Sequence, residues 1–146
     1  MPLCAWLGSI DISESLNAFA ENKLAALKQR NLLRTLAETV LGTTDVAYQG
    51  DVYDFGKPFT RITVFDSILH FNPEIDPAKL ADLDGARAIA ESLGIPLKDS
   101  YGLGKVQIEI FEKTVEHRLK DPTFITEYPT EVSPLARRMD DNPFVT

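Results

Sequence analysis

The spacing of hydrophobic residues predicts a mixture of helices and short strands. Before Gly42 the apolar residues recur every three or four positions, which predicts a helix over about residues 14–41, or two abutting helices, with Ser13 as the N-cap. Residues 44–55 and 59–62 instead carry short β-branched and aromatic runs, which predict a hairpin followed by a further strand. We therefore expect an α+β fold.

A series of helix-boundary signals follows these strands. Such signals are side chains that accept a hydrogen bond from the first turn, prolines at the first helical position, and residues that stop a helix. The predicted N-caps are Thr63, Asp76, Asp84 and Ser100, and the predicted helix ends are Asn72, Gly94 and Leu119. These signals predict a block of short helices over about residues 65–120.

The stretch 121–138, DPTFITEYPTEVSPLARR, is the most informative part of the chain. Residues 123–127 are mostly β-branched or aromatic and predict a buried strand, which Pro129 ends because proline cannot donate to a ladder. Alternation places both apolar and polar groups on each face of this strand, and such mixed faces often border a site. Two adjacent guanidiniums, Arg137 and Arg138, follow beyond the strand.

The candidate site residues lie at and just beyond the end of this strand: Glu127, Tyr128, Ser133 and Arg137. Two interpretations remain open for them. In the first, these side chains lie close to a substrate. In the second, Tyr128 and the prolines only shape a loop, while the arginines pair with Glu131 or Asp140.

The other chemical motifs are incomplete. Residues 102–105, GLGK, lack the earlier glycine and the following Ser or Thr of a phosphate loop, so we interpret them as a glycine-loosened helix start. The carboxylates between residues 109 and 117 lack the spacing of a di-metal helix pair and predict surface ion pairs such as Glu109 with Lys113. Ser133 has no histidine next to it. We expect no catalytic residue and no metal ligand in this chain.

Composition and charge narrow the class of protein. The 146 residues suffice for one domain, and a hydrophobic content of 44% suffices for a core. The formal charge of −7 argues against a general nucleic-acid-binding face, because phosphates require basic residues. The single cysteine, Cys4, excludes an internal disulfide, and the apolar residues 1–12 lack the basic start of an export signal. We expect a cytoplasmic protein without a membrane span.

Residues 121–138 resemble a strand and the following loop in the catalytic domain of bacterial class II lysyl-tRNA synthetases, between the second and third class-defining motifs. Uncommon pairs carry this resemblance: Tyr128-Pro129, Ser133-Pro134 and Arg137-Arg138. It extends backwards through YGLGKVQIEIFEKTVEHRLKDPTF and VYDFGKPFTRITVFDSI to about Asn31, and thus covers about four fifths of the chain. Residues 1–30 have no counterpart that we recognise, as expected for a truncated or rearranged gene.

The resemblance implies part of a class II antiparallel-sheet domain that carries a helical insertion. It divides the chain into an unmatched, mostly helical segment 1–30, a helix with short strands at 31–64, the insertion at 65–120, and a sheet strand with its loop at 121–146. In the family, the strand at 123–127 lies between two neighbours that this chain lacks. We therefore expect two unpaired strand edges, a poorly anchored carboxy-terminal part, and self-association through the open strand.

The family uses ATP and Mg²⁺ to activate lysine and then transfers the lysyl group to tRNA, and its full-length members form homodimers. The family's ATP- and lysine-binding motifs are not found in this chain. The resemblance thus implies a fragment of a lysine-tRNA ligase that is inactive alone, binds neither ATP nor Mg²⁺ tightly and has no direct nucleic-acid face. Two alternatives remain: a non-catalytic partner-binding module derived from a synthetase, and the elongation-factor lysine ligase paralogue.

Overall fold

The computed structural model describes residues 31–146, which divide into two compact units at Lys57 and Pro58. In the first unit, a helix over residues 31–41 ends where Gly42 adopts a φ of +71° and donates its N–H to the Glu38 carbonyl at 3.1 Å. Glycine takes this left-handed conformation without steric cost, so the predicted helix end is confirmed. The predicted start of this helix and the proposed segment 1–30 lie outside the described residues.

A hairpin completes the first unit. Strand β1 (Asp45–Tyr48) pairs antiparallel with β2 (Asp51–Asp54), so the predicted hairpin is confirmed. Gln49 and Gly50 in the turn have φ values of 51° and 92°, and two positive φ values give the tight turn that matches the twist of paired strands. The Arg34 guanidinium donates to the Gly56 carbonyl, which ties the helix to the end of the hairpin.

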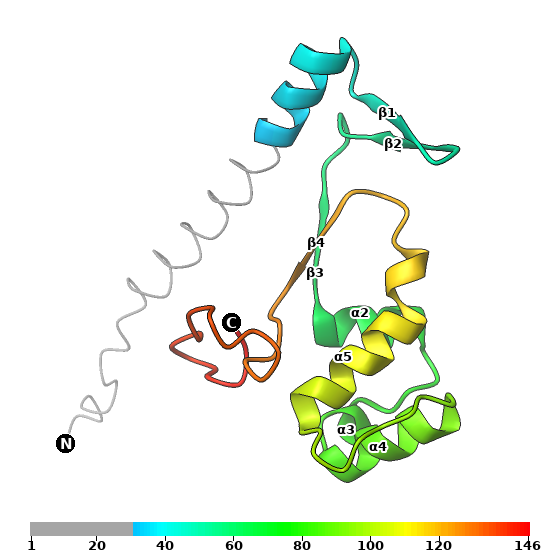
Figure 1. Ribbon diagram of the computed structural model, residues 1–146, viewed down its shortest axis with the longest axis vertical. Coiled ribbons are helices and arrows are strands. Elements are labelled where there is room, and N and C mark those ends of the chain that lie inside the picture. Colours follow the sequence, from blue (N-terminus) through cyan, green and yellow to red (C-terminus); the bar gives the residue numbers. More distant parts are fainter. Residues whose placement is uncertain (1–30) are drawn as a thin grey trace, which may run out of the picture. The chain divides into compact units, whose positions relative to one another are not determined.

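The second unit is a helical core with a small sheet. Its elements are β3 (Thr60–Thr63), α2 (Val64–Phe71), α3 (Pro77–Leu80), α4 (Leu83–Ser92), α5 (Leu103–Thr114), the 3₁₀ helix η1 (Glu116–Arg118) and β4 (Thr123–Thr126). Helix α5, yellow in Figure 1, packs against both α2 and α4. Ile68, Leu80 and Ile110 are fully buried where these helices meet, as expected for the apolar faces of amphipathic helices.

Two of the predicted helix caps are confirmed. The Thr63 hydroxyl accepts a hydrogen bond from the Asp66 N–H at 2.9 Å at the start of α2. The Asp76 carboxylate accepts from the Ala78 N–H at 2.9 Å, and Pro77 occupies the first helical position of α3. Each cap satisfies a backbone donor that has no partner within its own helix.

The other two predicted caps are wrong. Asp82, not Asp84, caps α4, because its carboxylate accepts from the Gly85 N–H at 3.0 Å while Asp84 already lies in the first turn. Ser100 does not cap α5, which begins at Leu103 after Gly102 in the N-cap position. Gly102 has no side chain, so it cannot itself accept a hydrogen bond from the first turn of α5.

The strand prediction at 123–127 is correct in place, but its expected pairing is wrong. Strand β4 pairs parallel with β3, from Thr60 opposite Thr123 to Thr63 opposite Thr126, so one edge of β4 is paired. The chain between the two strands forms the helical core, and such a crossover returns the second strand in the same direction as the first. The small sheet of this unit is therefore parallel, not antiparallel as the family resemblance implied.

The expectation of a poorly anchored carboxy-terminal part is also wrong. After β4 the chain turns back on itself, orange to red in Figure 1, and Pro129 bridges Val145. The Thr130 N–H donates to the Phe144 carbonyl at 2.8 Å, and the Thr146 N–H donates to the Tyr128 carbonyl at 2.9 Å. Val145 is only 7% exposed. Burial and backbone hydrogen bonds therefore hold this segment.

Candidate functional site

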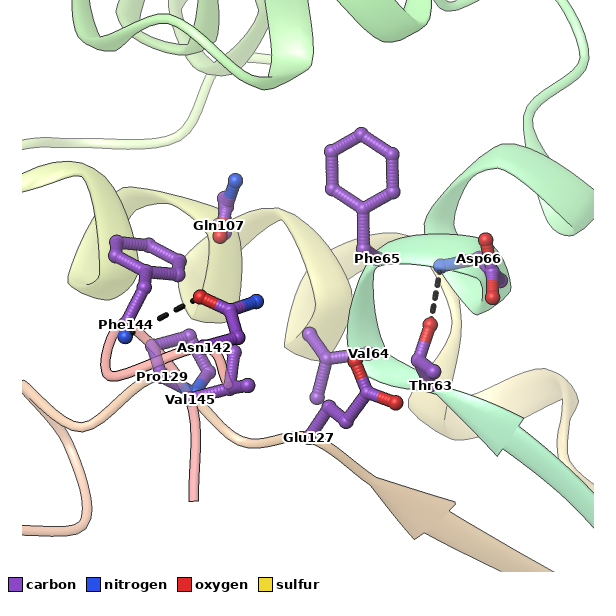
Figure 2. A pocket seen from close by; sticks show the side chains of 10 residues that line it. All are labelled: Thr63, Val64, Phe65, Asp66, Gln107, Glu127, Pro129, Asn142, Phe144 and Val145. Atoms are coloured by element: carbon purple, nitrogen blue, oxygen red, sulfur yellow. Dashed lines mark hydrogen bonds between the residues drawn. The ribbon is translucent and has the colours of Figure 1, made fainter. Parts of the chain in front are cut away.

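A pocket of about 320 Å³ lies in the second unit, next to the end of β4. It is lined by the start of α2, one residue of α5, and the segments on either side of the Pro129–Val145 bridge: Thr63, Val64, Phe65, Asp66, Gln107, Glu127, Pro129, Asn142, Phe144 and Val145. Figure 2 shows Glu127 beside Val64, with Asn142 and Phe144 approaching from the carboxy-terminal segment. Of the four predicted site residues, only Glu127 lines this pocket.

Glu127 ends the strand through an unusual backbone conformation. Its φ is +56°, in the left-handed region that side chains with a Cβ seldom adopt. Such a conformation costs of order 1 kcal/mol and persists only where the surroundings impose it. It redirects the chain from β4 into Tyr128 and Pro129, and Pro129 is fully buried. This conformation therefore changes the direction of the chain where β4 ends.

Tyr128 does not line the pocket, and its contacts are with the fold. Its ring packs against the core cluster, and its carbonyl accepts hydrogen bonds from the Thr146 N–H at 2.9 Å and the Thr146 hydroxyl at 3.2 Å. Burial raises the pKa of the Tyr128 phenol, and the carboxylates of Glu116 and Glu112 raise it further. Both causes act in one direction, because each disfavours the charged phenolate.

Ser133 and Arg137 lie apart from the pocket lining. Ser133 occupies a turn, where its N–H donates to the Thr130 carbonyl at 3.2 Å and its carbonyl accepts from the Ala136 N–H at 3.1 Å. Arg137 pairs with Asp140 at 2.9 Å, and its side chain is 84% exposed. The second interpretation of the arginines is therefore confirmed for Arg137, since its charge is used in a surface ion pair of small energetic worth.

The sequence analysis missed Glu131 as a functional side chain. Its carboxylate accepts hydrogen bonds from the Gly102 N–H at 2.9 Å and the Lys105 N–H at 3.1 Å, so it supplies the missing cap of α5. The signal was present in the two glycines at residues 102 and 104, which permit close approach of another segment. Their partner was not visible, because Glu131 lies 29 residues from Gly102 in the sequence.

The ionisable side chains around the pocket bear on the ligands that it could take. The pocket lining contains two carboxylates, Asp66 and Glu127, and neither Lys nor Arg, so a triphosphate would meet like charge there. Between residues 31 and 146 no group of three or more His, Cys, Asp and Glu side chains is placed to hold a metal ion. Residues 102–105 form the start of α5, and the Lys105 ammonium pairs with Glu109 at 2.8 Å.

The chain is similar to part of several known proteins. No protein-family model matches the chain. The lysine–tRNA ligase of Thioalkalivibrio sulfidiphilus is 71% identical over 116 residues, which are 80% of this chain and 23% of that protein. The ligases of Teredinibacter turnerae and Hahella chejuensis are 63% and 60% identical over 139 and 143 residues, and each match takes in 91% of this chain and 28% of the relative. This chain is homologous to part of the lysine–tRNA ligases.

The homology confirms the resemblance to lysyl-tRNA synthetases and sets its extent. The chain spans only about a quarter of the length of these lysine–tRNA ligases, between 23% and 28%. Residues 31–146 are 116 residues, or 80% of the chain, so a match of 91% also takes in some of residues 1–30. We had expected those residues to lie outside the resemblance.

Proposed function

We propose that this chain is a segment of the catalytic domain of a class II lysine–tRNA ligase, from the region between the second and third class-defining motifs. The identity of 71% over 116 residues to a lysine–tRNA ligase carries this proposal. The complete ligase uses ATP and Mg²⁺ to activate lysine, transfers the lysyl group to tRNA in the cytoplasm, and forms a homodimer. Between residues 31 and 146, no helix is both long and apolar enough to cross a membrane.

The segment contributes position rather than chemistry to this reaction. In the described residues, Glu127 borders a pocket while Tyr128 and Pro129 fix the backbone beside it. Catalysis of acyl and phosphoryl transfer depends on holding reacting groups in place and on electrostatic stabilisation. A strand and loop held by a helical core can provide the first of these. We assign the groups that provide the second to the rest of the ligase, which is about three quarters of its length.

We propose further that these 146 residues do not activate lysine by themselves. The test is lysine-dependent exchange between ATP and pyrophosphate, with the complete ligase of Thioalkalivibrio sulfidiphilus as the active reference. We expect exchange by the reference and none by this chain. Exchange by this chain that disappears in Glu127→Gln would disprove the proposed inactivity and place catalytic groups within the segment.

The alternative functions receive less support. All of the relatives described above carry the name lysine–tRNA ligase, which favours that family over an elongation-factor lysine ligase. A separate partner-binding module would leave the genomic sequence on both sides unrelated to a synthetase. Reading that sequence is a direct test, because a ligase segment requires the remaining synthetase motifs to be encoded there, in the same frame or in a shifted one.

A further inference from the structure

The amino terminus of α5 takes its cap from a distant segment. The first N–H groups of any helix have no partner within the helix and need an acceptor. Gly102, in the N-cap position, offers no side chain, and the two oxygens of Glu131 fill that role. Oε1 accepts from the Gly102 N–H at 2.9 Å and Oε2 accepts from the Lys105 N–H at 3.1 Å. The negative charge also lies at the positive end of the helix dipole, which adds to the attraction.

Two glycines permit this approach. A Cβ built on Gly102 would lie 2.7 Å from the Glu131 carboxylate, and one built on Gly104 would lie 2.6 Å from the Pro129 Cβ. Neither residue has a positive φ, so conformational freedom does not explain these glycines. Glycine is needed at these positions because the segment that carries Pro129 and Glu131 lies directly against the backbone of α5. Tyr128 and Val132, on either side, pack against the core.

We propose that Glu131 is a positioning residue, which by capping α5 holds the segment 129–138 in place on the helical core. That segment carries Ser133 and Arg137, and it directly follows Glu127 at the pocket. The proposal rests on the proposed function only for the place that the function gives to Glu127 beside the pocket. Its physical content is an anchor: in addition to the backbone hydrogen bonds of the segment, the carboxylate ties it to a helix of 12 residues.

Amide hydrogen exchange measured by NMR tests this proposal on the 146-residue chain. The amides of Gly102 and Lys105 donate to the Glu131 carboxylate and report the cap directly. The amides of Thr130 and Thr146 donate instead to the carbonyls of Phe144 and Tyr128. In Glu131→Ala we expect protection to fall about tenfold at all four amides, because charge-assisted hydrogen bonds are lost and the segment opens more often. Glu131→Gln keeps one acceptor oxygen, so protection at these amides should fall less than in Glu131→Ala.

The same experiment separates an anchor from a simple cap. A loss confined to Gly102 and Lys105, with Thr130 and Thr146 unchanged, would overturn the proposal. The matched control is Glu74→Gln, which removes an exposed carboxylate and should leave all four amides as in the wild type. The Ile110 amide, in the middle of α5, shows whether the core remains folded in each variant.

A second variant displaces the segment without removing the carboxylate. In Gly104→Ala the new methyl group would meet Pro129, so we expect faster exchange at Thr130 and Thr146. Alanine favours helix over glycine, so a weaker α5 could not explain that result. Wild-type exchange at both threonines would count against the anchor. Neither outcome bears on the family, because exchange requires no ligase activity.

Discussion

At the scale of single residues, Tyr128 shows how the fold changes the chemistry of a candidate-site side chain. Burial and the carboxylates of Glu116 and Glu112 raise the pKa of its phenol above the ordinary value of about 10. The folded protein therefore holds this proton more tightly than the unfolded chain does. The resulting stabilisation is fully present below the unfolded pKa and is lost as the pH rises through the folded pKa.

Tyr128→Phe should therefore make stability less sensitive to alkali. We expect the free energy of unfolding to fall less steeply with pH above about 10 in the variant, because phenylalanine has no proton to lose. Urea unfolding of both proteins across that range measures the difference.

The pKa of Lys105 is also raised, mainly by its hydrogen bond to Glu109, but Lys105 is present in both proteins, so its effect cancels in the comparison. Tyr48→Phe, at a position 62% exposed, is the control. Parallel pH profiles for wild type and Tyr128→Phe would refute the prediction.

At the scale of helices and strands, local signals predicted a cap correctly only where the stabilising partner lies within one turn. Thr63 and Asp76 were correctly predicted as caps because each bonds an N–H two or three residues ahead. The prediction of Asp84 as a cap was wrong because Asp82, two positions earlier, is an equally good acceptor. The sequence alone does not choose between them. The prediction of Ser100 as a cap was wrong for a different reason, since the cap of α5 is the long-range contact with Glu131.

The junction of α3 and α4 offers a test of packing at this scale. A Cβ built on Gly85 would lie 2.8 Å from the Lys79 Cα and still closer to the Lys79 carbonyl oxygen. These are backbone atoms, which cannot rotate away. Gly85→Ala should therefore destabilise the protein by about 1–3 kcal/mol through overpacking, although alanine in an open helix would stabilise it by up to about 1 kcal/mol.

Urea unfolding measures the effect of Gly85→Ala. The control is Ser92→Ala at the exposed end of the same helix, which should change stability by less than about 0.5 kcal/mol. A Gly85→Ala variant as stable as the wild type would show that α3 and α4 separate easily, and that the close approach is not required by the fold.

At the scale of the whole chain, the elements were predictable but several of their partners were not. The pattern of residues 123–127 located β4 to within one residue, yet a strand of four residues does not specify which strand it will join. The family resemblance implied antiparallel neighbours for β4, whereas β4 pairs parallel with β3. The candidate site was likewise predicted only in part. Glu127 lines the pocket. Ser133 lies in a local turn and Arg137 pairs with Asp140, and neither lines the pocket.

The last prediction concerns the independence of the second unit. The hydrophobic core cluster runs from Val64 to Val115, wholly within residues 58–146, and the carboxy-terminal segment bonds within the same unit. Because burial of apolar surface is the main driving force of folding, the residues that share one core should unfold together. We expect residues 58–146 alone to show one cooperative urea transition, with a midpoint within about 15% of that of the same transition in the full chain.

Ile110→Ala provides the internal check on this experiment. Ile110 is fully buried, so its truncation should lower the free energy of unfolding by about 2–5 kcal/mol in either protein. An equal cost in both would show that the excised unit contains the native core. If residues 58–146 instead unfold without cooperativity, or their midpoint depends on protein concentration, the core requires other residues or a second copy. The expected association through the remaining edge of β4 would then regain support.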